Sequence, residues 1–169
     1  MNKLIITCEI LISLVWRTID GILRIRISVY SNQYDLIQSK EELMIIIEKV
    51  DLNSKQLVNE FVQFQYDLYK KVPQFCPPFF DDIKLMLNKA KHPFYEHSEG
   101  EFFIARKDGK MAGRVGVFIN KPFNQYHQVK KAQFYLFDCV DDQEVADQLF
   151  EKAFEWCRQR GMEEVVGPK

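Results

Sequence analysis

Apolar and polar positions follow one pattern before residue 43 and another after it. Residues 4–16 form an apolar run interrupted by Glu9, and residues 23–29 alternate apolar and polar side chains like a strand with one solvated face. The run is shorter than the ~20 residues of a bilayer-spanning helix, and it lacks the cleavage site of a signal peptide. We therefore expect residues 1–42 to be an appendage to a domain at residues 43–169, or the product of a start codon assigned too early, with peripheral membrane contact as an alternative.

After residue 43 the periodicities predict strands and helices in turn. The β-branched run at residues 43–50 predicts a first strand. A helix then begins at a capping-box-like Asn53 and ends before Pro73, because apolar residues recur at helical spacing between them. The prolines that precede residues 79–89 predict the start of a second helix there. Residues 92–97 are expected to form a loop, because a proline biases the residue before it out of the helical region.

A β-hairpin is predicted in the middle of the domain. Residues 101–107 and 110–120 each fit a strand. Asp108-Gly109 lies between them, and this pair supplies the positive φ angles of a type I′ turn, whose twist matches that of the two strands.

A strand–helix–strand unit follows the hairpin. Residues 133–140 fit a strand that runs directly into a helix, which Asp141 caps with Glu144 at the third position and which Gly161 ends. The last strand is expected at residues 163–166. Such a unit implies a right-handed crossover and one parallel pair of strands. The predicted order is β-α-α-β-β-β-α-β, and the fold class is α/β with a mixed sheet.

Composition and charge exclude several classes of function. The 23 Lys and Arg residues nearly balance the 24 Asp and Glu residues, for a net charge of −1, so we expect no nucleic-acid partner. The four cysteines and three histidines lack the spacing of zinc ligands, so no metal site is expected. The cysteines are interpreted as reduced thiols of a cytoplasmic protein, with Cys157 on the buried face of its helix.

The order of elements and a series of short motifs resemble the N-terminal two-thirds of a GNAT-type N-acetyltransferase fold. The series is similar to a bacterial group that includes the bacterial ceramide synthases, and the likeness covers residues 43–169. The motifs are Tyr66-x-Leu68-Tyr69-Lys70, Pro77-Pro78, Phe94-Tyr95-Glu96-His97, Asp108-Gly109-Lys110-Met111-Ala112-Gly113-Arg114, Asn124 with His127, Asp141-Asp142-Gln143-Glu144-Val145-Ala146, Trp156, and Gly161-Met162 with Gly167-Pro168.

The resemblance implies acyl-CoA-dependent N-acylation of a small amine, with a sphingoid-type amine or another lipid amine as one acceptor. In such a fold the backbone of a splayed strand binds the pantetheine arm of acetyl-CoA or acyl-CoA, and the following helix presents free N–H groups to the pyrophosphate. The residues that the resemblance assigns to cofactor binding are Phe137, Cys139, Val140, Gln143, Glu144 and Val145.

Three residues, Glu96, His97 and Asp138, are candidates for the acyl-transfer chemistry. His97 lies in a proline-containing loop next to Glu96 and is a candidate general base, because histidine is the side chain that commonly gains and loses a proton near neutral pH, although a histidine that locks its loop is an alternative. Asp138 is expected beside the thioester, where it would bind or deprotonate the amine, or it simply ends a strand. Cys139 has no basic neighbour in the sequence that would make it a nucleophile.

Two features depart from the resemblance. The glycine-rich turn typical of the superfamily is replaced by residues 141–146, whose carboxylates would repel a phosphate unless they cap the helix or a basic residue intervenes. The strand at residues 163–166 would be left as an open edge, prone to self-association, and we expect the chain to be a fragment of a longer reading frame. The alternative function is therefore a non-catalytic GNAT-like module that binds a partner protein or a lipid.

Overall fold

The computed structural model of the protein describes residues 44–168. The expected appendage at residues 1–42, with its strand at residues 23–29 and its membrane contact, lies outside the described residues. Within residues 44–168, no helix has the length and apolar character needed to cross a membrane.

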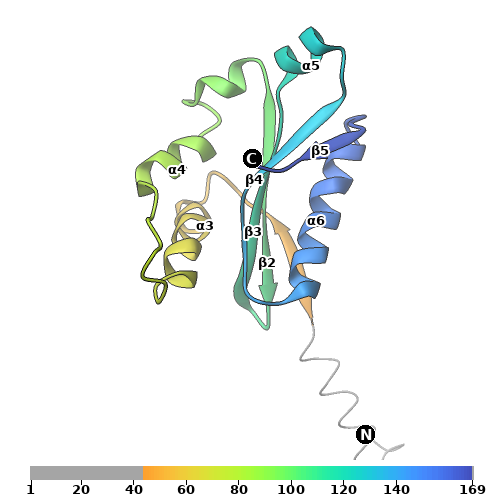
Figure 1. Ribbon diagram of the computed structural model, residues 1–169. Helices are drawn as coiled ribbons and strands as arrows, with labels where there is room; N and C mark the ends of the chain where they lie inside the picture. The colour runs from red at the N-terminus through yellow and green to blue at the C-terminus, as the bar shows by residue number, and fades with distance from the viewer. Residues whose placement is uncertain (1–43, 169) are drawn as a thin grey trace, which may run out of the picture. The chain divides into compact units, whose positions relative to one another are not determined.

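Five strands form one mixed sheet in the order β1-β2-β3-β4-β5 (Figure 1). Neighbours from β1 to β4 are antiparallel, whereas β4 and β5 are parallel. The parallel pair confirms the crossover predicted from the strand–helix–strand unit, because a helix carries the chain back between the two strands. The strands are β1 (Ile45–Lys49), β2 (Glu99–Lys107), β3 (Lys110–Ile119), β4 (Lys131–Cys139) and β5 (Glu164–Val166).

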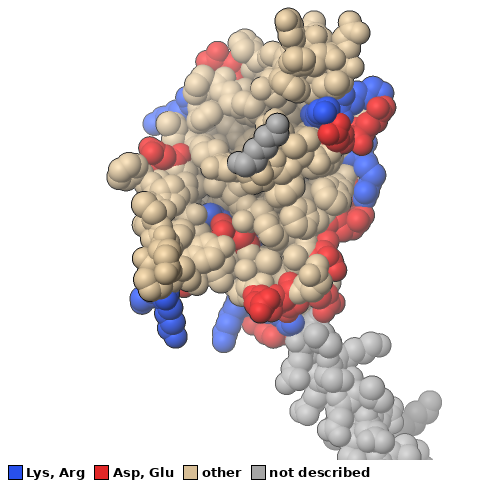
Figure 2. Space-filling view, viewed as in Figure 1, with Lys and Arg blue, Asp and Glu red and all other residues tan. Residues whose placement is uncertain are grey.

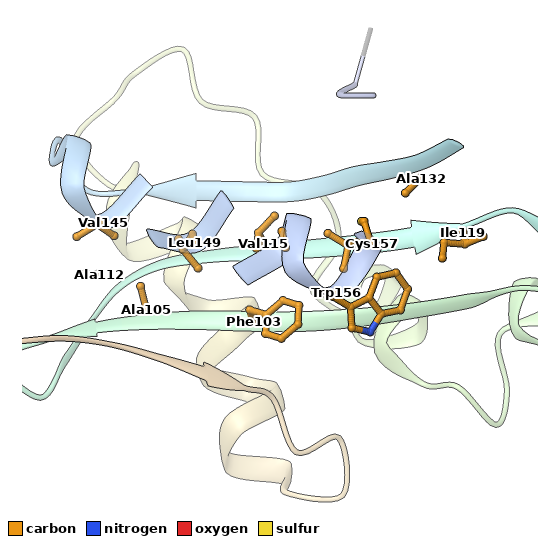
Figure 3. Close-up of a cluster of buried hydrophobic side chains, with 12 residues drawn as sticks. Phe103, Ala105, Ala112, Val115, Ile119, Ala132, Val145, Leu149, Trp156 and Cys157 are labelled. Atoms are coloured by element: carbon orange, nitrogen blue, oxygen red, sulfur yellow. The ribbon is translucent and has the colours of Figure 1, made fainter. Parts of the chain in front are cut away.

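Helices cover both faces of the sheet. α3 (Lys55–Leu68) and α4 (Phe80–Leu87) lie on one face, and α6 (Gln143–Arg158) lies on the other (Figure 1). On the α6 face, Val145 and Leu149 point toward the strands, and both are fully buried (Figure 3). Cys157, predicted on the buried face of its helix, is 1% exposed in the same cluster.

The α3–α4 face has a core of its own. Phe61 and Val62 of α3 are fully buried against Phe102 and Ile104 of β2, and the rings of Phe61 and Phe102 meet edge to face at 5.5 Å. Phe102 and Ile104 alternate with Phe103, which belongs to the α6 cluster, as the two-residue repeat of a strand requires. Full burial of such side chains contributes ~1.5–3 kcal/mol each.

The structure confirms the predicted hairpin and adds two short elements. Asp108 and Gly109 have φ angles of 53° and 73°, as a type I′ turn needs. The expected loop at residues 92–97 contains the 3₁₀ helix η1 (Pro93–Glu96), and a helix that was not predicted, α5 (Lys121–His127), joins β3 to β4.

Both predicted helix caps are displaced by one residue. Ser54, not Asn53, caps α3, because its Oγ accepts a hydrogen bond from the N–H of Leu57 at 3.3 Å. Asp142, not Asp141, caps α6. The backbone conformation before each helix, which the sequence does not reveal, decides which of two adjacent polar residues takes the cap position.

Candidate functional site

Strands β4 and β5 pair at three positions. Lys131, Ala132 and Gln133 pair with Glu164, Val165 and Val166, and β4 then continues without β5 as far as Cys139. The backbone of residues 134–139 therefore has no neighbouring strand on its β5 side within the described residues. The divergence of the two strands stays a prediction, because β5 ends at Val166, where the pairing ends.

A β-bulge in β4 redirects the side chains beyond it. Arg114 pairs with Asp138 and Gly116 pairs with Tyr135, so two residues of β4 oppose Val115 alone. Leu136 within the bulge has a φ angle of 55°, which is uncommon for a residue with a branched side chain.

The bulge reverses which residues of β4 face α6. Ala132 and Phe134 pack in the α6 cluster before the bulge, and Phe137 and Cys139 do so after it. An uninterrupted strand would have kept the even-numbered positions, Asp138 included, on the α6 face. Because of the extra residue, Asp138 points toward α3 instead.

Asp138 meets a buried arginine on that face. Arg114 of β3 is fully buried, and its Nε and Nη2 lie 2.9 Å and 2.7 Å from Oδ2 of Asp138. Its Nη1 donates to the carbonyl oxygen of Phe61 at 2.6 Å, and its Nη2 donates to Oε1 of Gln65 at 2.7 Å. Burial lowers the pKa of the Arg114 guanidinium, and the Asp138 carboxylate opposes that effect.

Tyr69 completes the group from the end of α3. Its hydroxyl donates to Oδ1 of Asp138 at 2.9 Å. Burial, followed by this hydrogen bond, raises the pKa of Tyr69 to about 12, so the hydroxyl keeps its proton at neutral pH. The Asp138 side chain is 14% exposed. A fixed carboxylate thus reaches the surface close to the unpaired part of β4, where it can attract and orient a cationic amine.

The first turn of α6 is occupied by a carboxylate of the chain itself. Oδ1 of Asp142 accepts hydrogen bonds from the N–H groups of Glu144 (3.0 Å) and Val145 (3.4 Å), and Nζ of Lys107 lies 2.5 Å from its Oδ2. The hydrogen bond from Lys107 holds the pKa of Asp142 below its usual value. Figure 2 shows acidic side chains gathered at the lower edge of this face, where β4 runs into α6 in the matching view of Figure 1. One carboxylate of the turn thus caps the helix and a lysine neutralises it, but this carboxylate also occupies the N–H groups that an anion would use.

The residues assigned to cofactor binding lie along this same stretch of chain. The side chains of Phe137, Cys139 and Val140 pack against the α6 cluster. The backbone of Val140 is already occupied, because its N–H donates to the carbonyl oxygen of Ala112 at 2.8 Å and its own carbonyl oxygen accepts the N–H of Asp142 at 2.7 Å. In the first turn of α6, Gln143 is hydrogen-bonded to Asp147, and Glu144 to Gln148. Burial and the neighbouring carboxylates raise the pKa of the Cys139 thiol, which agrees with the expectation that it is no nucleophile.

Glu96 and His97 lie at the opposite end of the sheet from Asp138. Both side chains are exposed, and they are 3.9 Å apart. They precede Glu99, whereas Ile104 is the β2 residue level with Arg114 and Asp138. Five residues of extended strand span ~17 Å. The structure therefore brings Asp138 together with Arg114 and Tyr69, but not with Glu96 or His97.

Two residues of the motif series lie in α5. Asn124 and His127 both belong to this helix. The side chain of Asn124 donates to the carbonyl oxygen of Lys131 at 2.8 Å, so it holds α5 against the start of β4. Among residues 44–168, no group of three or more His, Cys, Asp or Glu side chains is placed to hold a metal ion.

Arg114, Gln65 and Tyr69 were not among the predicted site residues. The one signal for Arg114 is a charged residue within an otherwise apolar strand, since residues 111–119 hold no other charge. Tyr69 belongs to a motif that carried the resemblance, but its contact with Asp138 spans 69 positions of the sequence.

The chain is similar to two curated proteins over about two-thirds of its length. It is 28% identical over 115 residues to the protein YghO of Escherichia coli (strain K12). The matched residues are 68% of this chain and 29% of that protein. It is 29% identical over 112 residues to the bacterial ceramide synthase of Caulobacter vibrioides, which covers 66% of this chain and 29% of that protein. The chain thus matches less than a third of the length of either relative. No family model matches it.

The solved structures that the chain resembles are acetyltransferases. An aminoglycoside acetyltransferase from an uncultured soil metagenomic sample, in complex with sisomicin, has a TM-score of 0.54 at 16% identity and covers 74% of this chain and 77% of its own. A predicted acetyltransferase of Clostridium acetobutylicum with acetyl-CoA has a TM-score of 0.51 at 12% identity, and the match covers 75% of this chain and 81% of that chain. A tandem GNAT protein from the clavulanic acid biosynthesis pathway has a TM-score of 0.54 at 13% identity and covers 70% and 34%. The described residues have the fold of the GNAT acetyltransferases, as the sequence resemblance predicted.

Proposed function

We propose that the protein is an acyl-CoA-dependent N-acyltransferase in which the open edge of β4 binds the acyl donor and Asp138 holds the acceptor amine. The observation that carries the proposal is the combination of a bulged, unpaired strand with a fixed carboxylate beside it. The GNAT fold of the solved acetyltransferases supports it.

The donor is proposed to bind along residues 134–139, the part of β4 that does not pair with β5. A pantetheine arm carries amide groups that can pair with an unpaired strand as another strand would. Because β4 continues directly into α6, the rest of the donor would lie near Asp142 and Lys107. The fit is incomplete there, because the carboxylate of Asp142 already accepts the N–H groups that a pyrophosphate would use. Pyrophosphate binding requires Asp142 to turn away, which would free Lys107 to contact the phosphates.

Asp138 is proposed to orient the amine that attacks the thioester. A cationic amine first releases one proton to solvent, which frees the electron pair of its nitrogen. The new C–N bond then forms as the C–S bond breaks, and the sulfur takes up the second proton that leaves the nitrogen. Oδ2 of Asp138 is occupied by Arg114, which leaves Oδ1, shared with Tyr69, to accept an amine N–H. Taking a full proton would weaken both bonds from Arg114, so we assign Asp138 an orienting role. Holding the amine beside the thioester supplies much of the rate in such a reaction. The proposal gives no role to Glu96 or His97.

The acceptor class is proposed to be an amine with an apolar chain, such as a sphingoid base. The connection between α3 and α4 exposes Val72 (44%) and Phe79 (78%), and it begins just after Tyr69. An apolar chain lying along these side chains would bring its amine toward Asp138. The similarity to the bacterial ceramide synthase of Caulobacter vibrioides supports the same class of acceptor.

A thermal-shift titration of the full chain with CoA and acyl-CoA tests the donor site. Ligand at ~100 times its dissociation constant stabilises a native protein by ~2.7 kcal/mol, so a saturable rise in Tm is expected. Asp138→Asn should keep this ligand-induced rise, although its own Tm is lower, and should lose acyl transfer to an amine, followed by release of CoA thiol. Asp67→Asn, an exposed substitution on α3, should match the parent in both assays. Absence of any shift at millimolar acyl-CoA would contradict the proposal.

One observation favours the second candidate function, a GNAT-like module that binds a partner or a lipid without catalysis. Asp142 occupies the first turn of α6 in the way that a bound anion would. If the module is non-catalytic, acyl-CoA causes no thermal shift, and binding of lipid vesicles or of another protein survives Asp138→Asn.

A further inference from the structure

A second concave site lies at the start of α3, away from Asp138. It is a pocket of about 930 Å³ between the end of β1, the first turn of α3 and the end of α4. Lys55 lines it at the first residue of α3, and Tyr69 follows the last residue of the same helix. A helix of that length spans ~20 Å, so the pocket is separate from the proposed acyl-transfer site.

The charge of the pocket is positive in a chain whose net charge is −1. Four lysines and two carboxylates line it. Glu101, whose side chain is 7% exposed, is neutralised by Lys49 at 2.7 Å and Lys89 at 3.2 Å. Lys55 and Lys84 have no carboxylate partner among residues 44–168. The ammonium of Lys84 lies over the ring of Phe80, 4.7 Å from its centroid, and Oδ1 of Asp51, the second carboxylate, accepts hydrogen bonds from the N–H and side-chain amide of Asn53. Neither ammonium group is held by a carboxylate, so both can turn to a ligand.

A polar group and an apolar floor lie beside these lysines. Oδ1 of Asn88 accepts hydrogen bonds from the N–H groups of Ala90 (3.1 Å) and Lys91 (3.2 Å), which fixes the side chain and leaves its amide NH₂ as a donor. Leu52 and Val58, both half-buried, line the same pocket with apolar surface. The lining thus combines donors for an anion with a surface for an apolar or flat group.

We propose that this pocket binds a small soluble organic phosphate. Its phosphate contacts Lys55, Lys84 and the amide of Asn88, and its apolar part rests on Leu52 and Val58. Two unpaired ammonium groups match the two negative charges of a phosphate monoester, and lysine contacts phosphate as a point charge with three donors. Glu101 takes no part in binding, because both of its oxygens are already paired.

NMR titration of the full chain with adenosine 5′-monophosphate tests the proposal, with inorganic phosphate as a second probe. Amide shifts are expected at residues 49–59 and 84–90, with tighter binding of the nucleotide than of phosphate because only the nucleotide has a flat group. Lys55→Gln combined with Lys84→Gln should weaken binding about fivefold or more. Lys71→Gln combined with Lys110→Gln removes the same charge from exposed positions outside the pocket and should leave the affinity unchanged.

Three outcomes would overturn the proposal. Shifts at other residues would place the phosphate elsewhere, and equal weakening by both double variants would mean non-specific attraction. Binding to vesicles of anionic phospholipid, with none to either soluble probe, would mean that the lysines serve a membrane surface. None of these outcomes bears on acyl transfer, which depends on Asp138 and β4.

Discussion

Replacing Asp138 by Asn removes the carboxylate that neutralises Arg114. The guanidinium is fully buried, and Asp138 supplies its one carboxylate contact among residues 44–168. The bonds to the Phe61 carbonyl oxygen and to Gln65 would remain, but neither partner carries a charge. Loss of one member of a buried ion pair typically costs ~3–5 kcal/mol, because the other charge is left uncompensated.

The expected loss for Asp138→Asn is about 3 kcal/mol, at the lower end of that range, because Asn can still accept one hydrogen bond. A domain of this size would lose about 10 °C in Tm. Urea denaturation measures the free energy of unfolding, and a double-mutant cycle with Arg114→Met isolates the interaction. The double variant should be less destabilised than the sum of the two single variants by about 2 kcal/mol. A loss below ~1 kcal/mol for Asp138→Asn, with additive effects, would refute the reasoning.

Tyr69→Phe should remove one phenol ionisation near pH 12 from an ultraviolet titration and leave that of Tyr95, whose pKa burial also raises to about 12. Because the folded pKa of Tyr69 exceeds the ordinary 10, the stability that its hydroxyl contributes should be present below pH 10 and lost as pH rises toward 12. An unchanged titration would contradict this assignment. Asp142→Asn keeps the helix cap but removes the charge, so calorimetry should show several-fold tighter CoA binding. Weaker CoA binding by the variant would mean that the carboxylate helps the donor to bind. The hydrogen bond from Lys107 lowers the pKa of Asp142, so the contribution of this carboxylate to folding stability is present above about pH 4 and is lost in acid. The variant should lack this acid dependence. Gly113→Ala places a methyl group 2.7 Å from Cδ1 of Leu149 in α6. The free energy of unfolding, measured by urea denaturation, should fall by ~1–3 kcal/mol. An unchanged free energy of unfolding would mean that α6 can move outward freely.

The sequence predicted the sheet and its crossover because those features depend on local signals. The Asp108-Gly109 pair defines the hairpin, and the helical repeat between two apolar strands implies the parallel pair. α5 escaped prediction because it has only seven residues, too few to show a repeat, and an Asn cap with a proline in its first turn was its one signal.

The candidate site could be predicted only in part. Asp138 was a candidate from its place at a strand end, but its partners come from β3 and from α3, and contacts across such distances in sequence leave no local pattern. The bulge did leave a trace, since Phe134 and Phe137 are three positions apart where an uninterrupted strand would put core residues two apart. Glu96 and His97 show the converse, because a suggestive pair of residue types in a loop turned out to lie far from Asp138.

Hydrogen–deuterium exchange of the full chain, with and without saturating acetyl-CoA, tests the location of the donor site most directly. If the donor binds at β4 as proposed, exchange should be slower in peptides that cover residues 134–145. The pantetheine arm would pair with the free backbone of β4, and the remainder of the donor would cover the first turn of α6. Peptides of α4, on the other side of the sheet, should exchange at the same rate in both samples. Unchanged exchange in residues 134–145 at saturating acetyl-CoA, or protection confined to other elements, would show that the donor does not bind at β4.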